Sequence, residues 1–453
     1  MHDFSNTDLY ELTMAAGYFH NRVDGIATFE LSIRSMPENR SYFVFSGLHA
    51  ALDLIRFGRF PSDAIEHLRS HPAFVHVEPA FFDYLAQFRF TGTLRAVPEG
   101  TVVFAQEPIV QVTAPVIEAQ LLETYLLASI HIEVLVATKA SRIADAASAD
   151  GVHRHVIDFG SRRAHGADAA VCAARAACIG GCAGTSNLKA GAVYGLNTFG
   201  TMAHSWVSVF NCEEDAFRRY HELFPDTAVL LLDTYDTLAA IDAMDTIGRD
   251  VKAVRLDSGD LDLLSRTVRK KLDAKGFVQT KIFASGDLDE YSISKLVSHG
   301  APIDGFGVGT RLVTSADCPF VPVVYKLVQM DDKNGLHMKC KISQGKASYP
   351  GKKQVYRCMN RSGVYTGDFI CLADEPEPSR SFPLLETYVE QGNVCMPYAS
   401  VSSAAQRAAV QKRCFSPELF RLDSPQRYPV LPSKRLEGEY RQLADSFKTP
   451  PSR

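Results

Sequence analysis

The sequence predicts an α/β protein built around an irregular, TIM-like α/β barrel. After residue 150 an apolar stretch ends five times in Asp, Gly, Ser or Thr just before a helix or loop, which is typical of parallel strands. Residues 1–116 alternate like strands of a separate domain, and beyond residue 330 the strand–helix alternation stops. We therefore predict an N-terminal α+β domain (1–116), a barrel that carries the active site (117–330), and a C-terminal segment (331–453) that packs back on the N-terminal domain and completes it.

The composition is that of a soluble globular protein with two or three structural units. The chain has 453 residues, of which 46% are hydrophobic and 22% charged, and its net charge is −4. This charge argues against nucleic acid as the main partner, while a local arginine cluster still allows an anionic small substrate. The ten cysteines form no CxxC pair, the first residues do not resemble a signal peptide, and the charge-free stretch 190–212 is too polar for a membrane helix. We expect a cytoplasmic protein that binds neither nucleic acid nor membranes.

The N-terminal part begins with a helix and continues with strands. In SNTDLYELTMAAGYFHN, Thr7 is positioned to cap a helix that has Asp8 in its first turn. Residues 26–46 and 91–115 alternate in the manner of strands separated by turns, and residues 117–147 are rich in Ala, Leu and Glu, as helices are.

The predicted barrel strands share one kind of C-terminal end. Each strand runs into polar residues, in the segments 152–160, 228–236, 252–260, 281–287 and 303–310. Because the carboxyl ends of parallel strands meet on one face of a barrel, we expect these polar ends to form one site.

The side chains of these loops suit a phosphorylated sugar. Arginines offer forks for phosphate or carboxylate oxygens, carboxylates suit ribose hydroxyls and Mg²⁺, and glycine-rich turns expose backbone N–H groups to a phosphate. Taken singly, each feature is explained equally well by a helix cap, a turn or a solvated arginine. Their convergence on one face favours a site, and its candidates are Arg162, Arg163, Arg255, Asp257, Asp260, Gly286, Asp287, Gly307, Gly309 and Thr310.

A single histidine, His204, lies in the charge-free stretch, two residues before the only tryptophan, Trp206. A lone histidine in such a stretch is most often a core residue whose ring is hydrogen-bonded. In dry surroundings it could also be a general base, a hydrogen-bond donor or a nucleophile that accepts a phosphoryl group. Spacing alone does not choose between these roles.

Seven motifs that occur in order identify a resemblance. They are TDLYELTMAAGYF (7–19), DFGSRRAHG (158–166), GTSN (184–187), GTMAHSW (200–206), VRLDSGDL (254–261), ASGD (284–287) and GFGVGT (305–310). Together they resemble nicotinate phosphoribosyltransferase, a type II phosphoribosyltransferase, and KQVYR (353–357) resembles its C-terminal part. The resemblance implies that nicotinate is joined to 5-phosphoribosyl 1-diphosphate (PRPP), giving nicotinate mononucleotide and diphosphate for NAD salvage. It also implies Mg²⁺, and ATP hydrolysis coupled to synthesis through a phosphohistidine.

The resemblance assigns roles position by position. It implies that His204 is the phosphorylated residue, and we expect Asp233 to accept a hydrogen bond from its ring. Tyr10 and Phe159 are expected to sandwich the pyridine ring, with Tyr10 contributed by the other subunit of a homodimer. The remaining expected contacts are Arg162, Arg255 and Thr201 for nicotinate and diphosphate, Asp257 and Asp287 for ribose, and Gly307, Gly309 and Thr310 for its 5-phosphate.

The choice of pyridine is expected to depend on Ser186. The related nicotinamide enzyme is expected to carry an acid there, which would accept the amide but repel a carboxylate, whereas serine can donate to a carboxylate. We therefore favour nicotinate over nicotinamide or quinolinate. Two rival functions are a barrel that binds a nucleotide without catalysis and a sugar-phosphate aldolase or isomerase, although the strand ends lack the lysine of a Schiff-base enzyme.

Overall fold

A computed structural model describes residues 3–342 and 348–447 in two compact units. Unit 1 comprises residues 1–135 and 320–453, and unit 2 comprises residues 136–319. The three-part division predicted from the sequence, with boundaries after residues 116 and 330, stays a prediction about domains.

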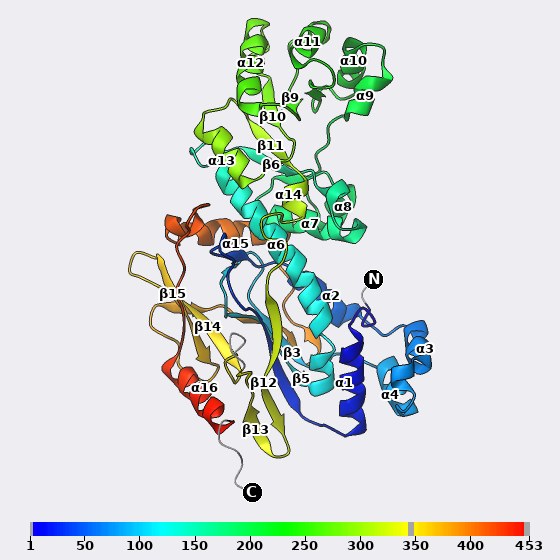
Figure 1. The fold of residues 1–453 in the computed structure, drawn as a ribbon, viewed down its shortest axis with the longest axis vertical. Coiled ribbons are helices and arrows are strands. Elements are labelled where there is room, and N and C mark those ends of the chain that lie inside the picture. Colours follow the sequence, from blue (N-terminus) through cyan, green and yellow to red (C-terminus); the bar gives the residue numbers. More distant parts are fainter. Residues whose placement is uncertain (1–2, 343–347, 448–453) are drawn as a thin grey trace. The chain divides into compact units, whose positions relative to one another are not determined.

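Unit 1 is organised by a seven-stranded sheet to which both ends of the chain contribute. Strand β1 (Ile26–Ile33) lies between β12 (Val323–Asp332) and β5 (Pro108–Pro115), and it is antiparallel to both. Strand β3 (Thr93–Ala96) pairs with β5 and with β17 (Glu386–Glu390), and the short strands β13 (Gly335–Met338) and β18 (Asn393–Val394) form the edges. The C-terminal segment thus completes the sheet that the N-terminal part begins (Figure 1).

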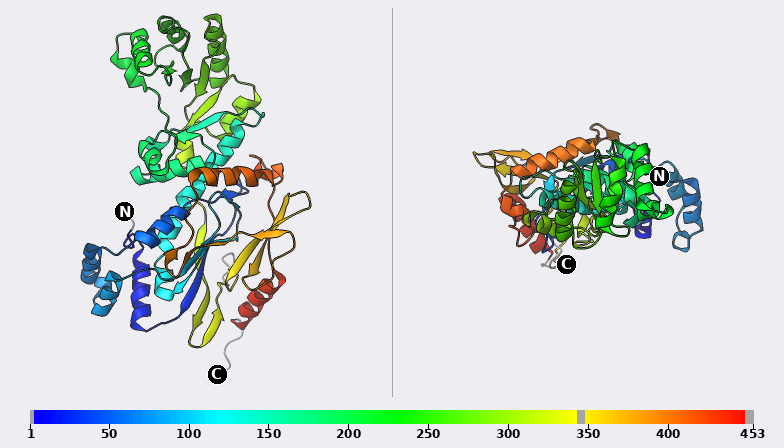
Figure 2. Two further views of the ribbon diagram at one scale, coloured as in Figure 1. Left: turned by 180° about the vertical axis from the view of Figure 1, so that it is seen from behind. Right: turned by 90° about the horizontal axis from the view of Figure 1, so that it is seen from above.

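Two smaller sheets and several helices complete unit 1. One sheet has the order β16 (Ser381–Pro383), β14 (Lys353–Met359), β15 (Tyr365–Leu372) and β19 (Val430–Pro432), and the other pairs β2 (Phe43–Val44) with β4 (Val102–Val103). Helix α16 (Lys434–Ser446), red in the figures, lies against β15 in opposite views (Figures 1 and 2). The other helices are α1 (Leu9–His20), α2 (Leu48–Phe57), α3 (Ser62–Ser70), α4 (Pro79–Ala86), α5 (Val116–Gln120), α15 (Val401–Arg413) and the first half of α6 (Glu123–Ala147).

Two helix predictions can be compared with the structure. The first helix begins one residue later than predicted, because its N-cap is Asp8 and not Thr7. The run Val116–Ala147 is long and apolar enough to cross a membrane, but 56% of its most apolar part is buried inside the protein. Core helices of folded proteins share this length, composition and burial, so the run is weak evidence for a membrane span.

Unit 2 contains a parallel sheet of six strands. Its order is β7 (Gly184–Thr185), β6 (His155–Asp158), β11 (Gly305–Val308), β10 (Lys281–Ala284), β9 (Ala253–Leu256) and β8 (Val229–Leu231). Its helices are α7 (Ala167–Ile179), α8 (Leu188–Tyr194), α9 (His204–Val209), α10 (Glu213–Leu223), α11 (Thr237–Asp242), α12 (Leu261–Ala274), α13 (Glu290–Ser298) and α14 (Thr310–Val313).

The predicted strand–helix alternation is therefore confirmed. Every strand predicted between residues 152 and 310 is present and parallel to its neighbours, in a row that runs from β7 to β8. Polar N-caps begin the helices that follow: Asp236 caps α11, Asp260 caps α12, and Asp289 forms a capping box with Ser292 on α13. Asp260, a candidate for the site, thus accepts hydrogen bonds from the first turn of α12.

Candidate active site

The carboxyl ends of the parallel strands place most candidate residues along one edge of the unit 2 sheet. Val308 is in register with Asp158, Ala284 with both Leu256 and Phe306, and Leu231 with Arg255. The residues that follow these positions therefore leave the sheet side by side. They include Phe159, Asp233, Asp257, Ser285 and Gly309.

His204 is exposed at this edge and is not a core residue. It is the first residue of α9, and 46% of its side chain is accessible. Its Nδ1 is 3.2 Å from the hydroxyl oxygen of Thr234, and its Nε2 is 3.9 Å from Oδ2 of Asp257. The core-histidine interpretation and the expected dry surroundings are both wrong for this side chain. One ring nitrogen is anchored, and the other faces a carboxylate beyond hydrogen-bond distance.

Asp233 contacts the loop after β9. Its Oδ2 accepts from the backbone N–H of Asp257 (3.1 Å) and from the hydroxyl of Ser258. Its Oδ1 is buried and has no hydrogen-bond partner within residues 3–342 and 348–447. The hydrogen bond to the histidine ring that we expected of Asp233 comes instead from its neighbour Thr234.

Arg255 lies on β9, where only 13% of its side chain is exposed. Its Nη1 donates to the hydroxyl of Thr201 (2.5 Å), its Nη2 is 3.7 Å from Oδ1 of Asp257, and its guanidinium lies 6.0 Å from the ring centre of Phe159. Burial lowers the pKa of Arg255, and the positive charge of Arg162 adds to this effect. The site thus brings Arg255, Thr201, Asp257 and Phe159 together. The charge of the exposed Arg162 also acts on Arg255.

Gly307 makes room for the ring of Phe159. It lies buried within β11, and a Cβ atom at this position would be 2.5 Å from two carbons of that ring. Carbon atoms normally approach to about 3.5–4.0 Å, so only glycine leaves the ring its place. Gly309 and Thr310 follow at the end of β11, where Gly309 precedes the first residue of α14. The glycine-rich pattern thus has a packing role at position 307 that the sequence analysis did not identify.

The ASGD loop passes close to the loop after β9. A Cβ atom on Gly286 would be 2.2 Å from the carbonyl oxygen of Asp257, and Gly286 has φ +97°, which suits glycine. Ser285 donates a hydrogen bond to Oδ1 of Asp257. The exposed Asp287 has φ +48°, a left-handed conformation that is uncommon for residues other than glycine and often marks functional sites.

Asp158 is a positioning residue that the sequence analysis missed. It is 1% exposed, burial raises its pKa, and its carboxylate accepts from the hydroxyl of Thr185 (2.6 Å) and the N–H of Gly160 (2.8 Å). Its carbonyl accepts from the N–H of Ser186 (2.8 Å). The same residue thus holds the loops that present Phe159 and Ser186, and its position in the DFG motif was the available signal. The Ser186 side chain itself is exposed.

Tyr10 is on α1, in unit 1, and 47% of the residue is exposed. Burial is the largest cause that raises its pKa, and the neighbouring carboxylates of Glu11 and Glu123 raise it further. Glu11 is fully buried, and its carboxylate accepts from the Gln120 amide (2.6 Å). Burial raises the pKa of Glu11 to about 7.

Among residues 3–342 and 348–447, carboxylates at the strand ends and a buried cluster in unit 1 have the chemistry to hold a metal ion. The strand-end carboxylates Asp233 and Asp257 offer oxygen ligands, and Oδ1 of Asp233 is a buried acceptor without a partner among the described residues. In unit 1, ligand atoms of the buried His49, Glu99 and Glu133 lie within 4.8 Å of one another. Glu99 there already accepts from the N–H groups of Gly47 and Leu48 at the start of α2.

Models of one family match three stretches of the chain. The nicotinate phosphoribosyltransferase (NAPRTase) N-terminal domain matches residues 6–131, the NAPRTase family model matches residues 154–346, and the nicotinate phosphoribosyltransferase C-terminal domain matches residues 378–438. The second stretch contains every candidate residue of the strand-end site.

Whole-length relatives agree with these matches. A nicotinate phosphoribosyltransferase of Mycobacterium tuberculosis is 44% identical, over 98% of this chain and 95% of the relative. The Homo sapiens nicotinate phosphoribosyltransferase is 30% identical, over 95% of each chain. The crystal structure of human nicotinic acid phosphoribosyltransferase superposes with a TM-score of 0.84 at 28% identity, covering 96% of this chain and 99% of that one. A Pyrococcus furiosus nicotinate-nucleotide pyrophosphorylase structure has a TM-score of 0.72 at 26% identity, covering 90% and 94%.

Proposed function

The chain belongs to the nicotinate phosphoribosyltransferase family, a family of transferase enzymes, and from this premise we propose that it joins nicotinate to PRPP. The products are nicotinate mononucleotide and diphosphate, and the reaction belongs to NAD salvage in the cytoplasm. The observation that carries the proposal is the cluster at the strand ends of unit 2, where Arg255 donates to Thr201 and where His204 and Arg255 each lie within 4 Å of the Asp257 carboxylate.

The glycosyl step needs positioning more than covalent help. The bond from ribose C1 to diphosphate breaks, C1 becomes cation-like, and the pyridine nitrogen supplies the electron pair for the new bond. Phe159 holds one face of the pyridine ring, which keeps its nitrogen in line with C1. Arg255 and Arg162 stabilise negative charge on the nicotinate carboxylate and the leaving group, and Thr201 fixes the guanidinium of Arg255.

Ribose and phosphate contacts follow from the same edge. Asp257 and Asp287 would accept from ribose hydroxyls, and the backbone around Gly309 and Thr310 would hold the 5-phosphate. Asp233 and Asp257 would hold Mg²⁺, because the free buried oxygen of Asp233 fits a hard cation. Mg²⁺ bound there would neutralise charge on the departing diphosphate.

ATP is proposed to phosphorylate His204. A ring nitrogen takes the γ-phosphoryl group from ATP, releasing ADP and the ring proton, and water later removes the phosphoryl group. The phosphohistidine adds roughly −1.5 to −2 charges if phosphoserine is a guide. Nε2 of His204 lies 3.9 Å from Oδ2 of Asp257, and at a separation of about 4 Å each added charge would repel that carboxylate by about 1 kcal/mol in water and about 4 kcal/mol near a protein surface.

This repulsion would act on the loop that is proposed to hold ribose. Oδ1 of Asp257 accepts from Ser285, next to Gly286 and Asp287, so displacement of the carboxylate moves the loop that holds ribose. The phosphorylated and free forms then bind substrates and products differently, which is the requirement for hydrolysis to drive synthesis.

The phosphorylation step is tested with ATP labelled on its γ-phosphate. We expect acid-labile label on the wild type and on His153→Ala, an exposed histidine of unit 2 used as a matched control. His204→Ala should carry no label, and its nicotinate mononucleotide formation should no longer respond to ATP. Label that persists on His204→Ala would remove the assignment.

The acceptor is tested by offering nicotinate, nicotinamide and quinolinate side by side with PRPP. We expect nicotinate to be used best. Preference for either of the other two would reassign the substrate, and the absence of product from all three would favour a binding barrel without catalysis.

We also propose a homodimer in which the partner subunit supplies Tyr10 to the site. If so, Tyr10→Ala and Asp257→Asn, each inactive as a pure protein, should regain activity when they are co-expressed. The reason is that a hybrid dimer contains one site with neither substitution. No recovery in isolated hybrid dimers would contradict the shared site.

A further inference from the structure

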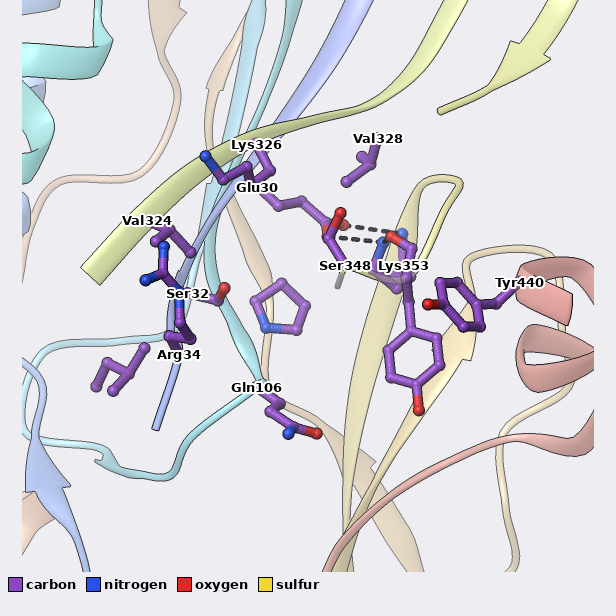
Figure 3. A pocket seen from close by; sticks show the side chains of 13 residues that line it. Glu30, Ser32, Arg34, Gln106, Val324, Lys326, Val328, Ser348, Lys353 and Tyr440 are labelled. Carbon is purple, nitrogen blue, oxygen red and sulfur yellow. Dashed lines mark hydrogen bonds and ion pairs between the residues drawn. The ribbon is translucent and has the colours of Figure 1, made fainter. Parts of the chain in front are cut away.

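A cavity lies entirely within unit 1, and none of its lining residues belongs to the strand-end cluster of unit 2. Its volume is about 290 Å³, just below the range of about 300–1,000 Å³ that is typical of small-molecule sites. Strands β1, β12 and β14, the residues just before β14 and helix α16 supply most of its wall (Figure 3). The proposed transferase reaction gives this cavity no role.

The floor of the cavity is a buried ion pair that is already satisfied. Nζ of Lys353 lies 2.8 Å from Oε2 of Glu30 and donates to the carbonyls of Tyr349 (2.8 Å) and Gly351 (2.7 Å). An ammonium group has three donors, so Lys353 has none left for a ligand. Gln111 donates to the other carboxylate oxygen of Glu30 (2.8 Å). The ion pair therefore forms a floor without net charge, against which a ligand could pack.

The cation available to a ligand is Arg34. Its guanidinium has no ion-pair partner among the residues that the structure describes, whereas the charge of Lys326 already acts on Glu123. In Figure 3 the ammonium group of Lys326 points away from the centre, and Arg34 lies on the side opposite Tyr440. An arginine fork matches a carboxylate or phosphate group better than any neutral group.

The other end of the cavity is aromatic. The rings of Tyr349 and Tyr440 meet edge to face, with centres 5.6 Å apart and planes at 70°, and burial raises the pKa of Tyr349. In Figure 3 the hydroxyl group of Tyr440 points toward the centre of the cavity. These rings offer a wall against which a planar ring packs.

Gln106 adds a polar side chain to the wall of the cavity. It lies in the turn before β5, where its φ is +73°, a left-handed conformation that is uncommon for residues other than glycine. Its N–H donates to the carbonyl of Ile33, next to Arg34, and its amide lines the cavity with the hydroxyl of Ser32. Gln106 thus adds a polar group to the wall between the cationic and the aromatic ends.

We propose that this cavity binds a small aromatic anion, with its carboxylate or phosphate on Arg34 and its ring against Tyr440 and Tyr349. The size of the cavity favours a single ring. Ser32 and Gln106 would hydrogen-bond to polar atoms between the two ends. Its residues are distinct from those assigned to the proposed nicotinate site, and the proposal does not depend on the transferase activity.

The proposal is tested by ligand-observed NMR on the full chain with benzoate, phenyl phosphate and the neutral benzyl alcohol. We expect both anions to bind more tightly than the alcohol, and the tighter of the two identifies the anionic group. Arg34→Gln should weaken binding about 10- to 100-fold, because charge-assisted hydrogen bonds contribute about 1.5–3 kcal/mol. Arg361→Gln, an exposed arginine of unit 1, is the matched control and should bind as the wild type does.

Further variants separate a binding role from a structural one. Tyr440→Leu should weaken binding about two- to tenfold, and Tyr440→Phe should restore the ring contact. Gln106→Gly relieves the backbone strain, so it should keep or raise the thermal midpoint while it weakens binding. Asp257→Asn should bind as the wild type does. No binding at millimolar concentration, or binding that Arg34→Gln leaves intact while Asp257→Asn abolishes it, would overturn the proposal.

Discussion

Replacing Gly307 by alanine tests whether Phe159 positions nicotinate. The added Cβ would lie 2.5 Å from two ring carbons of Phe159 and 3.4 Å from Cβ of Ser285, so the ring, not the serine, must move. Restoring ordinary carbon–carbon separations of about 3.5–4.0 Å requires a displacement of about 1 Å. Misplacing a reactant by that distance costs about a hundredfold in rate, and overpacking costs about 1–3 kcal/mol of stability.

The assay is steady-state kinetics of nicotinate mononucleotide formation with each substrate varied in turn. For Gly307→Ala we expect kcat/KM for nicotinate to fall about 10- to 100-fold, with little change in KM for PRPP. Gly309→Ala is the matched control, because its Cβ would meet only the backbone of Phe159, at 3.3 Å. That variant should affect PRPP more than nicotinate, since Gly309 is assigned to the 5-phosphate.

The opposite pattern would refute this reasoning. If Gly307→Ala kept the wild-type KM and kcat for nicotinate, the ring of Phe159 would not be a wall of the nicotinate site. If it raised KM for PRPP alone, Gly307 would act in the phosphate cradle, as the glycine-rich sequence suggests. The double variant Gly307→Ala with Phe159→Leu provides a further check, because a smaller side chain should recover stability without recovering nicotinate binding.

Three other changes test separate parts of the structure. Ser186→Asp should raise KM for nicotinate about two- to fivefold relative to nicotinamide, because repulsion at this exposed position is screened; a greater loss for nicotinamide would contradict the specificity argument. The pKa of Glu11 is raised from 4.5 to about 7, so the folded protein holds a proton that the unfolded chain loses, and stability falls by about 3 kcal/mol as the pH rises from 4.5 to 7. Glu11→Gln should therefore flatten the dependence of the thermal midpoint on pH between 5 and 8, and an unchanged slope would show that another group is responsible. Glu290→Gln should destabilise the protein by about 3–5 kcal/mol in chemical denaturation, since its buried carboxylate pairs with Lys139 (2.5 Å) and Arg142 (2.9 Å), and a change below 1 kcal/mol would show that these cations are otherwise compensated.

The parallel sheet and the strand-end site could be predicted because their signals are local. An apolar strand followed by a polar loop occupies fewer than ten residues, and parallel pairing brings such ends together without further information. Arg255 and Asp257 were found in this way, as residues just inside or just after a strand. The ordered motifs then supplied roles that spacing could not assign, such as phosphorylation of His204.

The remaining features depend on contacts between distant segments. Nothing in the sequence near Gly307 indicates that the ring of Phe159, almost 150 residues earlier, occupies the space where its side chain would be. We expected Asp233 to be the hydrogen-bond partner of His204, because a carboxylate is the commoner partner. In the structure the ring instead contacts the hydroxyl group of the next residue, Thr234. The N-cap of the first helix was predicted as Thr7 and is Asp8, because both residue types suit that position and the sequence does not choose between them.

The interleaving of the two chain ends in unit 1 has a consequence for biosynthesis. Phe29 on β1 is in register with Leu327 on β12, about 300 residues later, so on a ribosome β1 and β5 emerge long before their sheet can be finished. Meanwhile β1 presents an unpaired edge with apolar side chains, the kind of surface that promotes aggregation. Unit 2 is one continuous stretch of chain, so it can fold before the last part of unit 1 has been synthesised. A nascent chain that stalls after residue 319 would consequently be a substrate for chaperones rather than a shortened enzyme.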